Sequence, residues 1–596
     1  MFHPTPAIVT RFAARRLPRW VLILLGLAYV VPGLLGRDPW RHNDLAVFGA
    51  MLDLAQYPQH WWQPQVLGQA VDTGAWLPYW LGAAAIRLLP FVPADQAMRL
   101  PFAGLLVLTL AGTWYATYHL ARLPTAQPVH FAFGGEAQPA DYARALADTA
   151  LLALVASLGL GLLSHEAGPS SAQLACSALL LYASARLAQP ADASRRFGTG
   201  AVLSWWCGAV GLALSGAPVV GATLGLGWLG WSAHALWRQR EPASGQLWQG
   251  VTWIVCATGT LAAGALLWQA DPARWVRIWH QLPQWAHWST WQSYAELWLW
   301  FAWPAWPLAL WTLWRWRHRL HSAHIALPLW FVAVATVWSW LLLGQDRALL
   351  LALPALACLA AFAAPTLQRH VTALMDWFAL LFFSGCAAII WLFWLAMQTG
   401  LPPKPAASVA RLLPGFSAEF SGWQWWPALL ATGLWLGLVV WRLGRHQPAL
   451  WKSLALSAAG SVLCWLLLMT LWLPALNHGM GLAPIARRIA ALAPPGTSCT
   501  LVHGLRASEI TALHYHGGLA LQRTGTAAPA HNGDQSCQLL VVAPQALATL
   551  AQVVHLPDWE VLSTVPRLRE NRERWLVFSR RTAPGTDSSA EETPGN

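Results

Sequence analysis

Long apolar stretches recur along the chain and decide what it can fold into. Each stretch holds about 20 residues, which is the length that an α-helix needs to cross a bilayer, and "RALLLALPALACLAAFAAPTL" is a clear example. Hydropathy, read together with Pro-rich and charged breaks, predicts about thirteen membrane-spanning helices. They lie near residues 19–35, 96–120, 147–164, 171–188, 198–214, 217–237, 248–270, 296–314, 324–343, 348–366, 373–398, 424–441 and 453–473.

The composition agrees with a polytopic α-helical membrane protein. Apolar residues make up 56% of the chain and charged residues only 10%, whereas soluble proteins carry about 25% charge. The 43 tryptophans suit the two membrane–water interfaces, where the ring is buried and its N–H stays hydrated. The net charge of +12 is assigned to cytoplasmic loops. A nucleic-acid-binding protein would need a cluster of basic residues on a soluble domain, and the sequence shows no such cluster. The sequence therefore predicts no nucleic-acid partner.

Basic residues predict the orientation in the membrane. The N-terminal "RFAARRLPRW" precedes an apolar run over residues 21–35 that no small-residue cleavage site follows, which predicts an uncleaved first helix with a cytoplasmic N-terminus. Most arginines before residue 476 fall in the gaps that this orientation places in the cytoplasm, as the positive-inside rule expects. An odd number of spans then places the C-terminus in the periplasm. We expect a multi-pass protein of the bacterial inner membrane.

The segments outside the spans predict two further parts. Residues 1–475 form the membrane domain, whose outer loop 36–95 contains "DLAVFGAMLDLA" and "GAWLPYWLGAAAIRLLP", two pieces expected as helices along the interface. Short β-type runs alternate with helical runs over residues 476–582, which predicts a small periplasmic α/β domain. Residues 583–596 are polar and expected to be disordered.

Two of the eight cysteines lie outside the predicted spans. Cys499 and Cys537 each open a predicted strand of the periplasmic domain, so they are expected to form a disulfide if those strands are neighbours. The other six fall in spans, where cysteine acts as a small apolar residue. No C-x-x-C motif and no zinc-type spacing occurs, and no metal site is predicted.

Charged residues gather at three places on the predicted outer side. For any single residue, an interfacial anchor or a structural ion pair is the simpler interpretation. Charge at a membrane edge is costly, however, and three groups distant in sequence on one face of one membrane indicate a site. The groups are Arg37, Asp38, Arg41 and Asp44 after the first span, His165 and Glu166 after the third, and Asp346 and Arg347 before the tenth.

These pieces resemble a known class of enzymes. An aspartate shortly after the first helix, in a long outer loop with interfacial helices, is similar to the GT-C class of polyprenyl-phosphate-sugar-dependent glycosyltransferases. Within this class the chain resembles the aminoarabinose transferases and the protein mannosyltransferases of glycosyltransferase family 39. The segments that carry the resemblance are "RDPWRHNDLAVFGAM", "GAWLPYWLGA", "MRLPFAGLL", "SHEAGPS", "FAWPAWPLALW" and "RALLLALPALACLAA".

The resemblance implies a role for each charged group. Asp44 takes the place of the catalytic aspartate, which would accept a proton from the acceptor hydroxyl or orient the acceptor. Guanidinium groups bind phosphate oxygens in a forked geometry and are suited to the donor phosphate. The residues implied are Arg37, Arg41 and Arg347 for the donor phosphate and His165 and Glu166 for the acceptor side. The partners would be a polyprenyl-phosphate sugar in the membrane and a periplasmic lipid, glycan or protein, with no cofactor.

The chain departs from the aminoarabinose transferases at several of their motifs. Those enzymes have an acidic residue after the aspartate and an arginine two positions further, where this chain has Leu45 and Val47. Their lysine-containing elements correspond here to residues 74–78 and to "LSGAPVV", neither of which has a lysine. Only Lys404 and Lys452 occur in the chain, so phosphate binding must rest on arginines. Aminoarabinose and lipid A are therefore not implied as substrates.

Two alternatives to a glycosyltransferase stay open. A transporter or flippase would show internal repeats and charged residues in the middle of its spans. The sequence has no visible repeat, and most predicted spans lack central charges. A non-catalytic membrane subunit or a degenerate member of the family is the other alternative, and the missing lysines keep it open.

Overall fold

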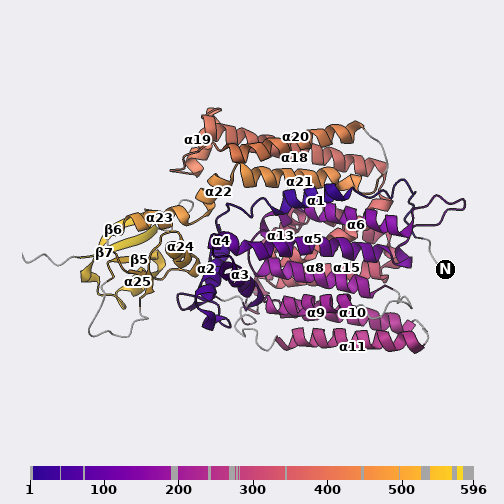
Figure 1. Ribbon diagram of the computed structural model, residues 1–596, viewed down its shortest axis with the longest axis horizontal. Coiled ribbons are helices and arrows are strands. Elements are labelled where there is room, and N and C mark those ends of the chain that lie inside the picture. The colour runs from indigo at the N-terminus through magenta and orange to yellow at the C-terminus, as the bar shows by residue number, and fades with distance from the viewer. Residues whose placement is uncertain are drawn as a thin grey trace, which may run out of the picture.

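The computed structural model divides into a helical bundle and a small sheet domain. It describes residues 5–40, 42–71, 74–189, 199–238, 243–266, 276, 279–280, 282–342, 345–444, 449–494, 497–524, 537–566 and 574–581. Figure 1 shows the bundle at one end of the molecule, the sheet domain at the other end, and α2, α3 and α4 between them. The start of the chain lies at the far end of the bundle from the sheet domain (Figure 1).

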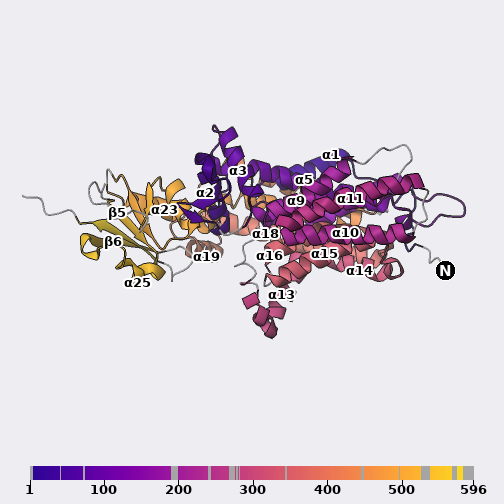
Figure 2. The same ribbon diagram turned by 90° about the horizontal axis from the view of Figure 1, so that it is seen from below.

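The long helices of the bundle run along a common direction (Figures 1 and 2). Among the described residues, five helical stretches are long and apolar enough to cross a membrane: Ala94–Ala121, Ala323–Leu341, Asp346–Thr366, Arg369–Thr399 and Lys452–Thr470. All of the predicted spans contain helical residues, whereas their number as membrane crossings stays a prediction. The bundle helices are α1 (Arg19–Val30), α5 (Arg99–Ala121), α6 (Pro139–Ala156), α7 (Leu160–Leu163), α8 (Pro169–Leu187), α9 (Thr199–Leu214), α10 (Pro218–Arg238), α11 (Ala243–Ala265), α13 (Trp288–Phe301), α14 (Ala305–Arg315), α15 (Ala323–Leu341), α16 (Asp346–Leu349), α17 (Leu353–Ala363), α18 (Arg369–Thr399), α20 (Gly422–Gly444) and α21 (Lys452–Thr470).

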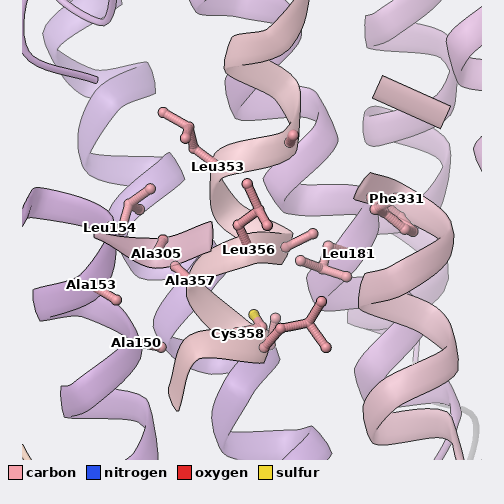
Figure 3. Packing of buried hydrophobic residues seen from close by; sticks show 14 of the residues in the cluster. Ala150, Ala153, Leu154, Leu181, Ala305, Phe331, Leu353, Leu356, Ala357 and Cys358 are labelled. Atoms are coloured by element: carbon pink, nitrogen blue, oxygen red, sulfur yellow. The ribbon is translucent and has the colours of Figure 1, made fainter. Parts of the chain in front are cut away.

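The stretch Asp346–Thr366 is the centre of the bundle. Of its apolar window 89% is buried, against 22% for Arg369–Thr399, which therefore lies at the periphery. Figure 3 shows the reason, because α17 is surrounded by side chains from α6, α8, α14 and α15. Small side chains such as Ala357 meet the small side chains Ala150 and Ala153 of α6, and small residues let membrane helices approach closely.

The predicted span near residues 296–314 is corrected by the structure. Two helices, α13 and α14, replace one continuous helix, because Pro304 has no N–H to give to the helical ladder. The 11 residues of α14 extend only about 16 Å, which is too short for a bilayer core of about 30 Å. The carbonyl groups of Phe301 and Trp303 accept hydrogen bonds from Gly159 and Leu158, in the break between α6 and α7. Figure 2 shows α13 projecting from the bundle.

The outer loop is helical where the sequence predicts interfacial helices. It contains α2 (His42–Gln56), a short hairpin of β1 (Gln65–Val66) and β2 (Gln69–Ala70), α3 (Leu77–Leu88) and α4 (Ala94–Ala97). The apolar face of α2 does not lie free at an interface. Its residues Leu45, Phe48 and Met51 are fully buried in a hydrophobic core that they share with the C-terminal part of the chain.

The C-terminal part is an α/β domain. Its five-stranded sheet has the order β4-β3-β5-β7-β6, in which β3 pairs in parallel with β4 and β5, and β7 pairs antiparallel with β5 and β6. Cys499 and Cys537 form a disulfide directly before the paired strands β3 and β5, with a Cα–Cα distance of 4.6 Å. The elements are α22 (Leu473–Met480), α23 (Ala483–Ala491), β3 (Thr500–His503), α24 (Ala507–Tyr515), β4 (Leu521–Arg523), β5 (Leu539–Val542), α25 (Leu547–Leu550), β6 (Trp559–Pro566) and β7 (Arg574–Arg580).

The boundaries that the sequence predicts for these parts stay predictions. The predicted disordered tail, 583–596, lies outside the described residues. The remaining described helix, α19 (Pro403–Leu412), follows α18 at the same end of the bundle as the C-terminal domain (Figure 1).

Helix α24 docks the C-terminal domain onto α2. The two helices approach so closely that a Cβ atom at Gly49 would collide with Thr511. Ile510 and Leu513 of α24 are buried in the same core as Phe48 of α2. The helix that begins next to the predicted catalytic aspartate is therefore held between the membrane domain and the C-terminal domain.

Candidate active site

Asp44 lies in the first turn of α2 and is almost fully buried. Its Oδ2 is 3.6 Å from Nη2 of Arg37 and 3.9 Å from Nη2 of Arg99, and its side chain is 1% exposed. The partial positive charge at a helix N-terminus further favours a carboxylate at this position. Neither carboxylate oxygen accepts a hydrogen bond from any described residue. Asp44 is thus charge-compensated but keeps its hydrogen-bonding capacity.

Arg37 is fixed by contacts on several sides. Its Nη1 donates a hydrogen bond to the main-chain carbonyl of His165 at 3.1 Å, and its guanidinium lies 4.4 Å from the ring centroid of Trp40. A cation over an indole face is a favourable electrostatic contact, particularly when it is desolvated. Arg37 is 1% exposed, so in this structure its guanidinium contacts Asp44 and is closed off from solvent and from a ligand.

Arg99 is a site residue that the sequence does not assign. It begins α5 and is 2% exposed, and its Nη1 donates to the main-chain carbonyl of Arg37 while Nη2 faces Asp44. Its Nε and Nη2 find no hydrogen-bond acceptor among the described residues. The signal in the sequence is an arginine at the start of an apolar run, in "MRLPFAGLL". That signal marks a membrane edge, but nothing in it indicates Asp44 as the partner.

Glu166 and Arg347 form a salt bridge, although the sequence assigns them to different substrates. Nε and Nη2 of Arg347 both donate to Oε2 of Glu166, at 3.2 and 2.7 Å. Burial raises the pKa of Glu166, and the charge of Arg347 opposes that rise. Asp44 raises the pKa further. Glu166 directly follows His165, whose main-chain carbonyl accepts the hydrogen bond from Arg37, and this contact brings the pair next to Asp44 and Arg37. The side chain of Arg347 is 26% exposed and therefore accessible to a ligand.

His165 is engaged in internal contacts. Its Nδ1 lies 2.6 Å from the carbonyl oxygen of Gly161 and its Nε2 lies 2.9 Å from that of Tyr29, while its ring packs against Tyr29 and Trp465. Burial lowers its pKa to about 4, so the imidazole is neutral and donates to one of these carbonyls. The acceptor-side role of His165 stays a prediction. Its observed contribution is the main-chain carbonyl that holds Arg37.

Asn477 of α22 holds the loop that leads from α1 to α2. Its Nδ2 donates to the carbonyl of Gly36 at 2.8 Å. Its Oδ1 accepts from the main-chain N–H of Asp38 at 3.1 Å and from Nε1 of Trp40 at 2.6 Å. Three hydrogen bonds from one side chain therefore fix the segment that contains Arg37. No pattern in the sequence indicates this residue.

The remaining predictions for the site are settled only in part. Arg41 lies outside the described residues. Within the described part of the chain, no group of three or more His, Cys, Asp or Glu side chains is placed to hold a metal ion. The described cluster unites three guanidinium groups with two carboxylates, those of Asp44 and Glu166. Such a surplus of buried positive charge suits an anionic group, because guanidinium forms short, charge-assisted hydrogen bonds with phosphate oxygens.

Comparison with solved structures identifies the fold. The chain is similar to ArnT from Cupriavidus metallidurans bound to undecaprenyl phosphate, with a TM-score of 0.57, 14% identity, and coverage of 94% of this chain and 98% of that one. The apo state of the same protein gives a TM-score of 0.55 at 16% identity, covering 94% and 97%. An oligosaccharyltransferase from Archaeoglobus fulgidus is more distant, with a TM-score of 0.43, 10% identity, and coverage of 88% and 69%.

The comparisons therefore confirm the predicted GT-C fold across most of the chain. No family model matches the chain, and no curated protein matches its sequence.

Proposed function

We propose that this chain, which has the GT-C fold, is an integral membrane glycosyltransferase that moves a sugar from a polyprenyl-phosphate donor to a periplasmic acceptor. The acceptor is a lipid, a glycan or a protein. The likeness to ArnT supports the proposal, because that protein binds undecaprenyl phosphate in its solved structure. On this proposal the protein lies in a bacterial inner membrane, with its N-terminus in the cytoplasm and its C-terminal domain in the periplasm.

The state of Asp44 is the observation that carries the proposal. Its carboxylate is buried beside Arg37 and Arg99. Neither carboxylate oxygen accepts a hydrogen bond from a described residue, so both can accept one from a substrate. A carboxylate of this kind can accept the proton of an acceptor hydroxyl. The hydroxyl oxygen then bonds to the anomeric carbon, and the bond from that carbon to the phosphate oxygen breaks. The lipid phosphate leaves with the electron pair of the broken bond.

The arginines divide into two roles in this proposal. Arg347 is the accessible one and would meet the donor phosphate after releasing Glu166. Arg37 is buried and keeps the charge of Asp44 compensated. The phosphate of a polyprenyl lipid stays at headgroup depth because its tail lies in the bilayer. Helix α2, whose first turn carries Asp44, lies at the end of the bundle that faces the C-terminal domain, which fits this requirement (Figure 1).

A non-catalytic member of the same fold is the second candidate. The side chain of Asp44 is 1% exposed between two guanidinium groups, which is also the geometry of a structural ion-pair cluster. A transporter is the third, and it would depend on charges in the middle of the spans rather than on this cluster.

Turnover of lipid-linked sugar by the purified, full-length protein tests the proposal. Asp44→Asn keeps the shape of the side chain and removes its basicity, so it is expected to lower turnover about 10²- to 10⁴-fold, with donor binding little changed. Asp53→Asn is the matched control, because Asp53 lies on the same helix and, among the described residues, pairs with His60 at 2.7 Å. Wild-type turnover by folded Asp44→Asn would refute the catalytic role and favour the structural ion pair.

A further inference from the structure

Tyr515 links the C-terminal domain to α2, which carries Asp44, and to α4, which lies just before Arg99. It is the last residue of α24, and its hydroxyl donates a hydrogen bond to Oδ1 of Asp95 at 2.8 Å. Its ring meets the ring of Phe48 edge to face, with centroids 4.8 Å apart. Phe48 lies on α2, one turn after Asp44, and Asp95 lies one turn before Arg99. Figure 1 shows α24 beside α2.

Asp95 lies in α4 and Arg99 begins α5; only Met98 separates the two helices, and its backbone is also helical, with φ −58° and ψ −25°. Residues four apart lie on the same face of a helix, so a bond that fixes Asp95 also fixes the turn from which Arg99 extends. Arg99 then contacts the carboxylate of Asp44 and the main-chain carbonyl of Arg37. The path from Tyr515 to Asp44 therefore passes through one hydrogen bond, one helical turn and one ion pair.

The charges around this path also come from the C-terminal domain. Burial raises the pKa of Asp38, and His516 opposes that rise more than any other charge. Asp95 raises the pKa, while Arg99 and Arg487 lower it. Arg487 of α23 and His516, which follows α24, thus act on acidic groups of the outer loop; burial lowers the pKa of His516, so Arg487 is the group that stays positively charged.

We propose that Tyr515 is a positioning residue for the transferase: by holding Asp95 it fixes the turn that carries Arg99 and keeps that guanidinium against Asp44. The proposal rests on the proposed function and extends it, because it makes the C-terminal domain part of the site's scaffold. Tyr515 itself touches neither substrate nor the reacting atoms.

Tyr515→Phe in the full-length protein is the direct test, since it removes the hydroxyl and keeps the ring that packs on Phe48. We expect kcat to fall about tenfold, because small displacements of a reacting group are costly. The KM for the donor is expected to stay unchanged, because the path leads to Asp44 and not to Arg347. Tyr57→Phe is the matched control, because Tyr57 is a half-exposed tyrosine of the same outer loop. Arg99→Lys should retain more activity than Arg99→Met, since only lysine preserves the charge.

Hydrogen exchange of the backbone amides gives a second measurement that does not depend on activity. Faster exchange over residues 94–99 is expected in Tyr515→Phe and not in Tyr57→Phe. In an active wild type, unchanged kcat in Tyr515→Phe overturns the proposal. If the wild type transfers no sugar, the proposed function fails, and unchanged exchange over residues 94–99 then overturns the positioning role separately. Asp95→Asn weakens the same hydrogen bond from the other partner and replaces Tyr515→Phe if that variant does not fold.

Discussion

Replacing Glu166 by glutamine is expected to strengthen the binding of the donor phosphate. Both donor groups that Arg347 uses, Nε and Nη2, are occupied by Oε2 of Glu166, at 3.2 and 2.7 Å. A phosphate that binds Arg347 must displace this carboxylate first. Glutamine has nearly the same shape but carries no charge, so in Glu166→Gln the phosphate displaces the side chain at position 166 from Arg347 more easily.

The size of the effect follows from the geometry of the pair. A hydrogen bond to a charged group contributes about 1.5–3 kcal/mol net. Arg347 is 26% exposed, and solvent screening weakens ion pairs, so the lower end applies. About 1.4 kcal/mol corresponds to a tenfold change in affinity. We therefore expect the Kd for the donor to fall about tenfold in Glu166→Gln and to rise at least about tenfold in Arg347→Ala.

Titration of the purified protein in nanodiscs with a polyprenyl phosphate, followed by native mass spectrometry, measures both changes. Asp376→Asn is the matched control, because Asp376 pairs with Arg442 at 2.5 Å, between α18 and α20 at the periphery of the bundle. This variant loses an ion pair of the same kind and is expected to bind the donor as the wild type does. Weaker donor binding by Glu166→Gln would refute the reasoning, since Glu166 would then orient Arg347 for the phosphate rather than compete with it.

Three further predictions follow from the charges, the cysteines and the orientation. Burial raises the pKa of Glu166, so the folded protein binds its proton at a higher pH than the unfolded chain. As the pH falls towards that raised pKa, donor binding by the wild type should tighten and the free energy of unfolding should rise; Glu166→Gln should lose the trend in donor binding and show a smaller rise in the free energy of unfolding. Cys499 and Cys537 should appear as a linked pair in mass spectra of non-reduced peptides; because they are 38 positions apart, Cys537→Ser should lower the free energy of unfolding by about 3–4 kcal/mol, and two free thiols under oxidising conditions would contradict the pairing. Reporter tags after Trp237 or Arg369 should be found in the cytoplasm and a tag after Asn596 in the periplasm; a cytoplasmic C-terminal tag would reverse the proposed placement of the site.

The sequence predicts the fold well where one physical demand acts alone. A helix in lipid must be apolar over its whole length, so hydropathy locates the helices of the bundle. Hydropathy fails at residues 296–314, because tryptophan and proline are apolar enough to hide a break in the helix. Pro304 lies in the middle of that stretch, yet its effect on the backbone does not appear in an apolar average.

The site is predicted in its members more than in its pairings. Arg37, Asp44, Glu166 and Arg347 stand out as costly charges at a membrane edge, and the structure brings all four into one cluster. No local signal in the sequence indicates that Arg347 pairs with Glu166, because the two residues are 181 positions apart. Arg99 illustrates the same limit, since its partners are decided by the packing of α5 against the outer loop.

The docking of α24 onto α2 bears on how the protein matures. The hydrogen bond between Tyr515 and Asp95 joins residues 420 positions apart, and that between Asn477 and Asp38 joins residues 439 positions apart. The segment around Asp44 emerges from the ribosome early, together with Arg37 and Arg99, but Asn477 and Tyr515 are synthesised much later. A nascent chain, or one truncated before these residues, therefore lacks these two supports. Docking of α22 and α24 against the outer loop then becomes a late step in assembly, on which the order of the segment around Asp44 depends.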